Sequence, residues 1–157
     1  GQIGQWAWAA QGITDPRSGF RAAPSAGATY PMELYFVRAD GVGHYEPQGH
    51  SLSSISDVDQ RRALSQAALG QTAVEDAALD IVITAVFQRT TARYGERGRQ
   101  YVYMEAGHIA ENIHLQAISL GLGSVPIGAF DDARVSRVLD LPEDHEPLYI
   151  ISVGHPR

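Results

Sequence analysis

The chain reads Arg21-Ala22-Ala23-Pro24-Ser25-Ala26-Gly27-Ala28-Thr29-Tyr30-Pro31 over residues 21–31 and continues directly as Met32-Glu33-Leu34-Tyr35-Phe36-Val37. Small side chains let backbone N–H groups approach a ligand closely, and a guanidinium offers a rigid donor fork to phosphate or a ring oxygen. The Leu, Tyr, Phe and Val residues that follow predict a strand over 32–38. The run therefore indicates a loop that holds a flat, anionic cofactor, with an ordinary connection into a strand as the alternative.

The sequence on either side alternates between helix-like and strand-like periodicity. A nearly continuous apolar run over 80–87 is typical of a strand covered on both faces. Apolar residues that recur every three or four positions predict one long helix over about 99–120. The other expected elements are a helix over 3–11, a loop over 13–28, a returning strand over 41–47, a surface helix over 57–69, a short strand over 124–127, a helix capped by Asp131 and a last strand over 148–153. This order predicts an α+β fold in which helices flank a central, mostly antiparallel sheet.

The composition indicates a globular protein with a single domain over residues 1–157. Hydrophobic residues make up 44% of the chain and charged residues 19%, which is enough for one sizeable core. A net charge of −6 argues against nucleic acid as a partner. The chain has no cysteine and no lysine, which excludes disulfides, thiolate metal sites, Schiff-base lysines and a P-loop.

The start of the chain and its hydropathy bear on where the protein works. No apolar run has the length of a membrane span, and the N-terminus lacks the pattern of a signal peptide. We therefore expect a cytoplasmic protein with no membrane partner. The chain begins at Gly1 without an initiator methionine, from which we expect it to start inside a longer natural protein.

A second run of small residues joins the long helix to the next one and reads Gly121-Leu122-Gly123-Ser124-Val125-Pro126-Ile127-Gly128-Ala129-Phe130-Asp131. No bulky side chain blocks the backbone N–H groups of residues 128 and 129, so they could donate to the edge of a flavin. An ordinary connector is the alternative. The glycine spacing is not a dinucleotide fingerprint, because it follows a helix and lacks a correctly placed third glycine. Ser25 likewise lacks the Gly-x-Ser-x-Gly turn of a hydrolase.

A polar, arginine-rich segment, residues 93–101, lies between the predicted strand and the long helix. Its side chains either form a solvated helix entrance or gather over a ligand pocket, in which Tyr94 would donate or accept a proton. Both interpretations fit the residues equally well.

Histidines and glutamates on the long helix are candidate metal ligands. They form two Glu-x-x-His pairs, Glu105/His108 and Glu111/His114. Six residues turn a helix by about 240° beyond a full turn, so one metal ion cannot collect both pairs. We predict no metal site and expect these side chains to be solvated or interface residues. His44 and His50 flank a predicted turn and are expected to be surface residues.

Four motifs stand in order along the chain. They are Arg-x-x-Pro-Ser-Ala-Gly-Ala-x-Tyr-Pro-x-Glu-x-Tyr at 21–35, Arg-Tyr-Gly-Glu-Arg-Gly at 93–98, Glu-Ala-Gly-His-x-Ala-x-Asn at 105–112 and Gly-Leu-Gly-x-Val-Pro-Ile-Gly-Ala-Phe-Asp at 121–131. Together they resemble the nitroreductase family, and the branch that they resemble most is the SagB-type dehydrogenases, which include azoline oxidases of peptide natural-product pathways. The resemblance runs from about Trp8 to Pro156.

The resemblance implies an FMN-binding α+β fold, an intertwined homodimer with FMN at its interface, and transfer of hydride or electrons through flavin N5, with NAD(P)H as the electron donor. The cofactor-binding residues expected are Arg21, Pro24, Ser25, Ala26, Gly27, Pro126, Ile127, Gly128, Ala129 and Arg157. The catalytic residues expected are Tyr94, Arg93 and Ala129, with the N–H of Ala129 or Gly128 near N5. The arginine pair and serine with which the family helps to bind the phosphate are not in this chain.

The expected function is that of an FMN-dependent oxidoreductase whose substrate is a small planar or heterocyclic molecule. One alternative is an azoline dehydrogenase that acts on a modified peptide. Azoline oxidases carry Lys-Tyr where this chain has Arg93-Tyr94, and arginine is a poor proton carrier. The other alternative is a flavin-free structural partner subunit.

Overall fold

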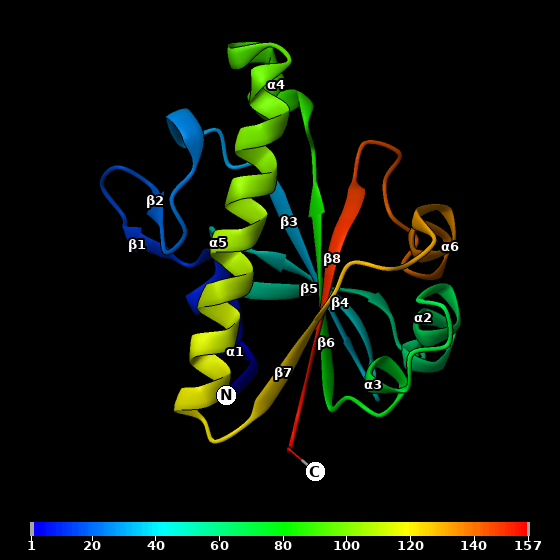
Figure 1. The fold of residues 1–157 in the computed structure, drawn as a ribbon. Helices are drawn as coiled ribbons and strands as arrows, with labels where there is room; N and C mark the ends of the chain where they lie inside the picture. The colour runs from blue at the N-terminus through cyan, green and yellow to red at the C-terminus, as the bar shows by residue number, and fades with distance from the viewer. Residues whose placement is uncertain (1, 157) are drawn as a thin grey trace.

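The computed structural model describes residues 2–156, in which helices cover both faces of one sheet (Figure 1). The helices are α1 Gln2–Gln11, α2 Arg61–Ala67, α3 Thr72–Glu75, α4 Gln88–Tyr94, α5 Arg97–Ser119 and α6 Asp132–Val138, with a short 3-10 helix η1 at Ala26–Ala28. The strands are β1 Ile13–Asp15, β2 Phe20–Arg21, β3 Met32–Arg38, β4 Gly41–Glu46, β5 Ser51–Ser56, β6 Leu79–Ala85, β7 Gly123–Ile127 and β8 Glu146–Gly154. This is the α+β class that the sequence predicts.

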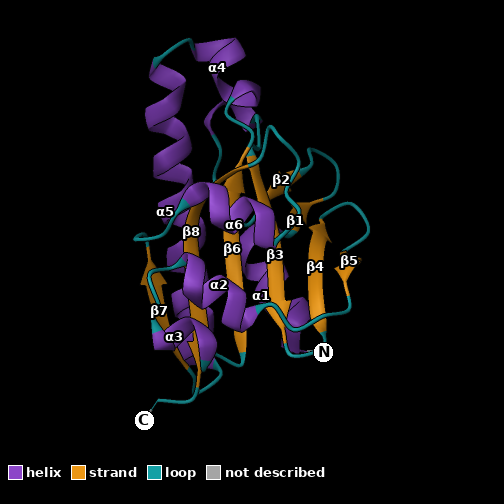
Figure 2. Cartoon of the chain, turned by 90° about the vertical axis from the view of Figure 1, so that its right-hand side faces the viewer, coloured by secondary structure: helices purple, strands orange, loops and turns teal. Residues whose placement is uncertain are grey.

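The central sheet has six strands in the order β5-β4-β3-β6-β8-β7, and each neighbouring pair is antiparallel. All seven residues of β6 are buried, which explains why its sequence is almost continuously apolar. Figure 2 shows the strands behind the helices of one face. The predicted antiparallel sheet is confirmed, as are its strands over 32–38 and 80–87, the second ending at Ala85.

Two hydrophobic cores lie on opposite faces of this sheet. Helices α1 and α5 cover one face, where Trp6 and Ile109 pack with Phe36 of β3. Helices α2, α3 and α6 cover the other face, where Leu64 and Val135 are fully buried. Alternate side chains of a strand point to opposite faces, so β3 contributes to both cores. Residues 21–31 lie on the side of the sheet that α5 covers, where η1 contacts α5. The chain after β7 continues to α6 on the other side.

Several elements differ from the sequence prediction. The predicted loop over 13–28 contains the β1–β2 hairpin and η1. Strand β5 escaped prediction because it is a serine-rich edge strand without apolar alternation, and α4 escaped because its sequence is polar. The surface helix starts at Arg61 and not at residue 57, because the Asp59 carboxylate accepts hydrogen bonds from the Arg61 backbone N–H at 3.1 Å and from its guanidinium at 2.6 Å.

Within residues 2–156 the structure has no helix with both the length and the apolar character needed to span a bilayer.

Helix α6 starts with the side-chain cap that the sequence predicts. The Asp131 carboxylate accepts a hydrogen bond from the Arg134 backbone N–H at 2.9 Å. Asp131→Ala removes this acceptor and is expected to lower the free energy of unfolding by about 1 kcal/mol. Urea denaturation measures the change, and Asp131→Asn, which keeps an acceptor oxygen, serves as the control. Equal losses in both variants would contradict a capping role.

Candidate active site

The proline–serine loop (residues 21–31) is folded back on itself by its own side chains. Ser25 Oγ accepts a hydrogen bond from the Tyr30 backbone N–H at 2.9 Å, and Tyr30 Oη accepts one from the Arg21 N–H at 3.2 Å. The Arg21 guanidinium lies 4.3 Å from the centre of the Tyr30 ring and donates to Gln11 Oε1 at 2.9 Å. The predicted cofactor loop is thus a compact, internally braced turn and not a loose connection.

This loop forms one wall of a pocket of about 640 Å³. The residues that line it are Phe20, Arg21, Ala22, Pro24, Ser25, Gly27, Ala28, Tyr30 and Arg93. Five of the seven predicted cofactor-binding or catalytic positions in the first two motifs therefore face one cavity, and Ala26 lies in η1 beside them.

Helix α4 brings Arg93 and Tyr94 onto the proline–serine loop. Arg93 Nη1 donates to the Gly27 carbonyl oxygen at 3.2 Å. A Cβ atom at residue 27 would lie 2.5 Å from Tyr94 Oη and 2.8 Å from Arg93 Nη1, so these groups occupy the space that glycine leaves open. Gly27 also has φ +58°, which glycine adopts without strain. Of residues 93–101, Arg93 is the one that lines this pocket.

Glu105 of α5, which was expected to be a solvated or interface residue, lies beneath the same loop. That expectation is wrong, because Glu105 is only 2% exposed. Burial raises its pKa to about 7, against the opposing effects of a hydrogen bond with Ser25 and the charge of Arg21. Its Oε1 atom has no hydrogen-bond partner of normal geometry within the described residues. A carboxyl group that can change its charge near neutral pH therefore lies directly under the loop.

The other residues of the two Glu-x-x-His pairs do not join it. His108 and Glu111 are exposed, as expected, and His114 forms a hydrogen bond with Ser124. In the part of the chain that the structure describes, no three His, Asp or Glu side chains lie close enough to hold a metal ion.

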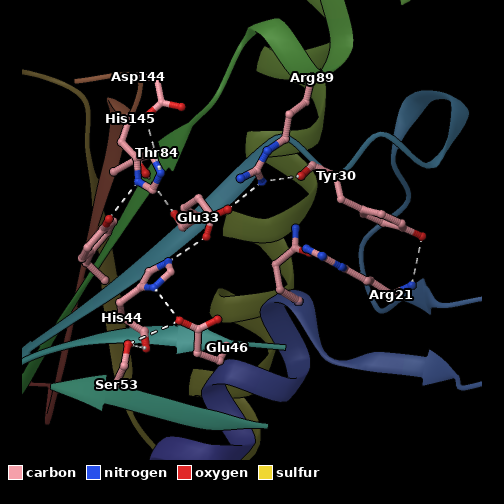
Figure 3. A network of polar contacts seen from close by, with 12 residues as sticks. Arg21, Tyr30, Glu33, His44, Glu46, Ser53, Thr84, Arg89, Asp144 and His145 are labelled. Atoms are coloured by element: carbon pink, nitrogen blue, oxygen red, sulfur yellow. Dashed lines mark hydrogen bonds and ion pairs between the residues drawn. The ribbon is translucent and has the colours of Figure 1, made fainter. Parts of the chain in front are cut away.

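A partly buried ionic network anchors the far end of the proline–serine loop (Figure 3). Arg89 Nη1 lies 2.6 Å from Glu33 Oε1 and donates to the Tyr30 carbonyl oxygen at 3.1 Å. His44 Nε2 lies 2.7 Å from Glu33 Oε2. Burial would raise the pKa of Glu33, but hydrogen bonds from His44 and Arg89 outweigh it and lower the pKa. The same hydrogen bond raises the pKa of His44.

This network is not predicted from the sequence. His44 was expected on the surface, whereas its side chain is only 17% exposed and contacts Glu33 on the neighbouring strand β3. His50 is exposed, as expected. The alternation of β3 carries the available signal, because Glu33 and Tyr35 fall on one face of the strand.

The glycine–alanine segment (residues 126–129) consists of the last two residues of β7 and the two residues that follow it. Pro126, Gly128 and Ala129 are exposed, whereas the Ile127 side chain is buried in the core and can offer only its backbone to a ligand. The backbone N–H groups of Gly128 and Ala129 donate to no acceptor among residues 2–156. A Cβ atom at residue 128 would meet only Tyr149, at 3.8 Å. The segment therefore presents two free donors on an open surface.

The two segments do not meet within one chain. The proline–serine loop packs on α4 and α5, whereas the Ala129 carbonyl oxygen accepts a hydrogen bond from Gln71 Nε2 on the α2 side at 3.0 Å. In Figure 1, η1 and the chain that leads from β7 to α6 lie on opposite sides of α5. A single chain therefore carries two halves of the predicted cradle, facing different ways.

A second pocket of about 670 Å³ lies along β7 and the end of β8, and the sequence analysis did not predict it. Its lining includes Arg61, Thr72, Ser124, Ser152, His155 and Pro156. Residues 123–125, which precede the glycine–alanine segment, belong to this lining. Arg157, the predicted phosphate ligand, lies outside the described residues.

Comparison with known proteins gives one consistent result. The model of the nitroreductase family matches residues 1–155. A nitroreductase-type protein of Methanocaldococcus jannaschii is 44% identical over 153 residues, which cover 94% of this chain and 76% of that protein. A crystal structure of a nitroreductase-type protein from Ralstonia eutropha superposes with a TM-score of 0.88 at 29% identity, covering 99% of this chain and 72% of the other.

Two further relatives have more specific names. The NADPH-flavin oxidoreductase of Vibrio harveyi is 32% identical over 114 residues, 68% of this chain and 48% of that protein. The microcin B17-processing protein McbC of Escherichia coli is 27% identical over 142 residues, 82% of this chain and 52% of that protein. The chain thus spans about half the length of these two relatives. With the family model matched almost end to end and the fold shared, the chain belongs to the nitroreductase family of oxidoreductases.

Proposed function

We propose that the protein is an FMN-dependent oxidoreductase of the SagB-type branch that uses NAD(P)H and acts on a small planar or heterocyclic substrate. The observation that carries this proposal is the pair of unpartnered N–H groups at Gly128 and Ala129 on an open surface of small residues. The V. harveyi relative, named an NADPH-flavin oxidoreductase, supports the choice of cofactor and electron donor.

The residues present fit a bound flavin. The N–H groups of Gly128 and Ala129 would donate to the edge of the ring, and Pro126 would lie against it. Pro24, Ser25, Ala26 and Gly27 would approach from the proline–serine loop, with Arg21 as a cationic group at its start. When bound, FMN supplies hydride or electron transfer through N5.

We place this flavin between two copies of the chain. The proline–serine loop and the glycine–alanine segment face different ways in one chain, so both can contact one flavin only if they come from two chains. Exposed apolar side chains on α5 supply a surface for the second copy, namely Tyr103, Met104, Leu115 and Ile118. The dimer is therefore part of the proposal, because the site is incomplete without it.

Within this site, residues of α4 and α5 would hold the protons that the reaction needs. Tyr94 Oη lies against Gly27 and could hold a proton next to the substrate, while Arg93 fixes the loop through the Gly27 carbonyl oxygen. Glu105, buried beneath Ser25, can store a proton because its pKa is raised to about 7.

A second candidate function is azoline oxidation on a modified peptide. The likeness to McbC, a microcin B17-processing protein, favours it, as does the position of Tyr94 Oη against Gly27. Under this alternative, Tyr94→Phe would abolish turnover of an azoline peptide while FMN binding stayed normal. Reduction of a nitroaromatic test substrate would not need Tyr94 and would separate the two functions.

Purification with added FMN tests the main proposal. We expect a yellow protein that runs as a dimer, releases FMN on denaturation and oxidises NADPH or NADH in the presence of a nitroaromatic acceptor. Ala129→Pro deletes one N–H donor and should weaken FMN binding by about tenfold, whereas Ala129→Gly keeps the donor and should not. A colourless protein that ignores added FMN would favour the flavin-free structural subunit.

A further inference from the structure

Arginines without acidic partners gather at one end of this acidic chain. Helix α4 and the start of α5 carry four arginines, and in the described residues only Arg89 has a carboxylate within 4.0 Å. The others lie over aromatic rings: Arg93 over Tyr94, Arg97 over Tyr101 and Arg99 over Phe87. In a chain of net charge −6, such a concentration of unpaired positive charge forms a local site for an anion.

Arg93 is the member of this group that reaches the 640 Å³ pocket. Its guanidinium is exposed and uses Nη1 for the Gly27 carbonyl oxygen. A guanidinium has five N–H donors, so most of them remain available to a ligand. Arg21, the second arginine of the lining, is held in place by Gln11 and Tyr30 and adds its charge from the opposite end of the loop.

The rest of the lining suits the apolar body of a flat ligand. Phe20 is 54% exposed, and Tyr30 and Pro24 offer further apolar surface. No acidic side chain lines this pocket. The charges of Glu33 and Glu105 both act on Arg21, but neither side chain lines the cavity, and Glu105 is buried under Ser25. A ring that bears one negative charge therefore matches the chemistry of the walls.

We propose that this pocket binds the substrate through an anionic group, a carboxylate or a phosphate carried on a planar ring, which the Arg93 guanidinium holds with the support of Arg21. The inference rests on the proposed function, because it names the class of substrate for that site. Arg93 is then a specificity-determining residue: it selects ring acids over neutral rings of the same shape.

Isothermal titration calorimetry on the FMN-loaded protein tests this with three probes of similar shape: para-nitrobenzoate, para-nitrophenyl phosphate and neutral para-nitrobenzyl alcohol. We expect wild type to bind the anionic probes more tightly than the alcohol. Arg93→Gln should raise the Kd of the anions by about tenfold and change that of the alcohol by less than about twofold. Arg93→Lys, which keeps the charge but not the planar fork, should recover part of the affinity. The tighter of the two anions identifies whether a carboxylate substrate or a phosphate-bearing donor uses the pocket.

Arg62→Gln is the matched control, since Arg62 is an exposed arginine on α2 and does not line the pocket. It removes the same charge and should leave all three Kd values unchanged. Equal binding of acid and alcohol by wild type would overturn the proposal, as would an equal loss of both in Arg93→Gln. The proposal would also be overturned if Arg93→Gln lowered the affinity for FMN but not that for riboflavin. Arg93 would then bind the phosphate of the cofactor and not an anionic group of the substrate. Failure of the wild-type protein to bind FMN would instead count against the proposed function, and the probes titrated without FMN would still test the pocket.

Discussion

Gly27→Ala is expected to weaken FMN binding by at least about tenfold. The new methyl group would lie 2.5 Å from Tyr94 Oη and 2.8 Å from Arg93 Nη1, closer than non-bonded atoms approach. Alanine is also strained at the φ of +58° that residue 27 adopts. Either the loop or α4 must shift, and both form the wall that would face the flavin. Fluorescence titration of FMN measures the effect, and a tenfold change corresponds to about 1.4 kcal/mol.

Gly107→Ala provides the matched control for this substitution. Gly107 lies on the exposed side of α5, where a Cβ atom would meet nothing within 4 Å. This variant should bind FMN as wild type does and should be slightly more stable, because alanine favours the helix. The proposed placement of the loop at the flavin would be refuted by a well-folded Gly27→Ala protein with the wild-type Kd. If Gly27→Ala and Ala129→Pro each lose binding, mixing the two should restore it in part, because a mixed dimer keeps one intact site.

Asp80→Asn is expected to remove a pH dependence of the free energy of unfolding. Asp80 lies in the central strand β6 and is fully buried, and burial raises its pKa to about 7, against the hydrogen bond from Ser152 Oγ. A carboxyl group whose pKa is higher in the folded than in the unfolded protein contributes stability below its ordinary pKa. That contribution is lost as the pH rises through about 7. Between pH 5 and pH 8, the free energy of unfolding of wild type should therefore fall by about 2–3 kcal/mol relative to that of the variant.

Urea denaturation at the two pH values measures this difference. Asparagine keeps an oxygen that can accept from Ser152, so the variant removes the ionisation and retains the hydrogen bond. The control is Asp132→Asn, an exposed carboxylate in the first turn of α6, which should show no such divergence. Parallel pH profiles for wild type and Asp80→Asn would rule out a buried, titrating Asp80. Glu105 acts in the same direction, but it is present in both proteins and cancels in the comparison.

The sequence predicts the elements in which burial alone determines the pattern of side chains. β6 is buried on both faces and α5 buries one stripe, so their apolar patterns are unambiguous. β5 and α4 have mostly polar sequences and are fixed by their neighbours: β5 by pairing with β4, and α4 by packing on α5. Local sequence carries little information about such tertiary pairing.

For the site, the sequence identifies the segments but not their arrangement. Residue types alone mark the proline–serine loop and the glycine–alanine segment as small and open. The hydrogen bond from Arg93 to Gly27 spans 66 positions, and only the packing of α4 against the loop creates it. The burial of Glu105 is missed for another reason: its charge favours solvent, although Val102 and Ile109, one turn before and after it on α5, are both buried.

Three side chains fasten the proline–serine loop to the body of the protein: Arg21 to Gln11, Arg89 to the Tyr30 carbonyl and Arg93 to the Gly27 carbonyl. The loop therefore gives up its conformational freedom when the chain folds and not when a ligand arrives. A ligand that meets such a preorganised wall loses little entropy by ordering it. Its association should thus carry a small unfavourable ordering entropy, and its rate should not be limited by loop closure.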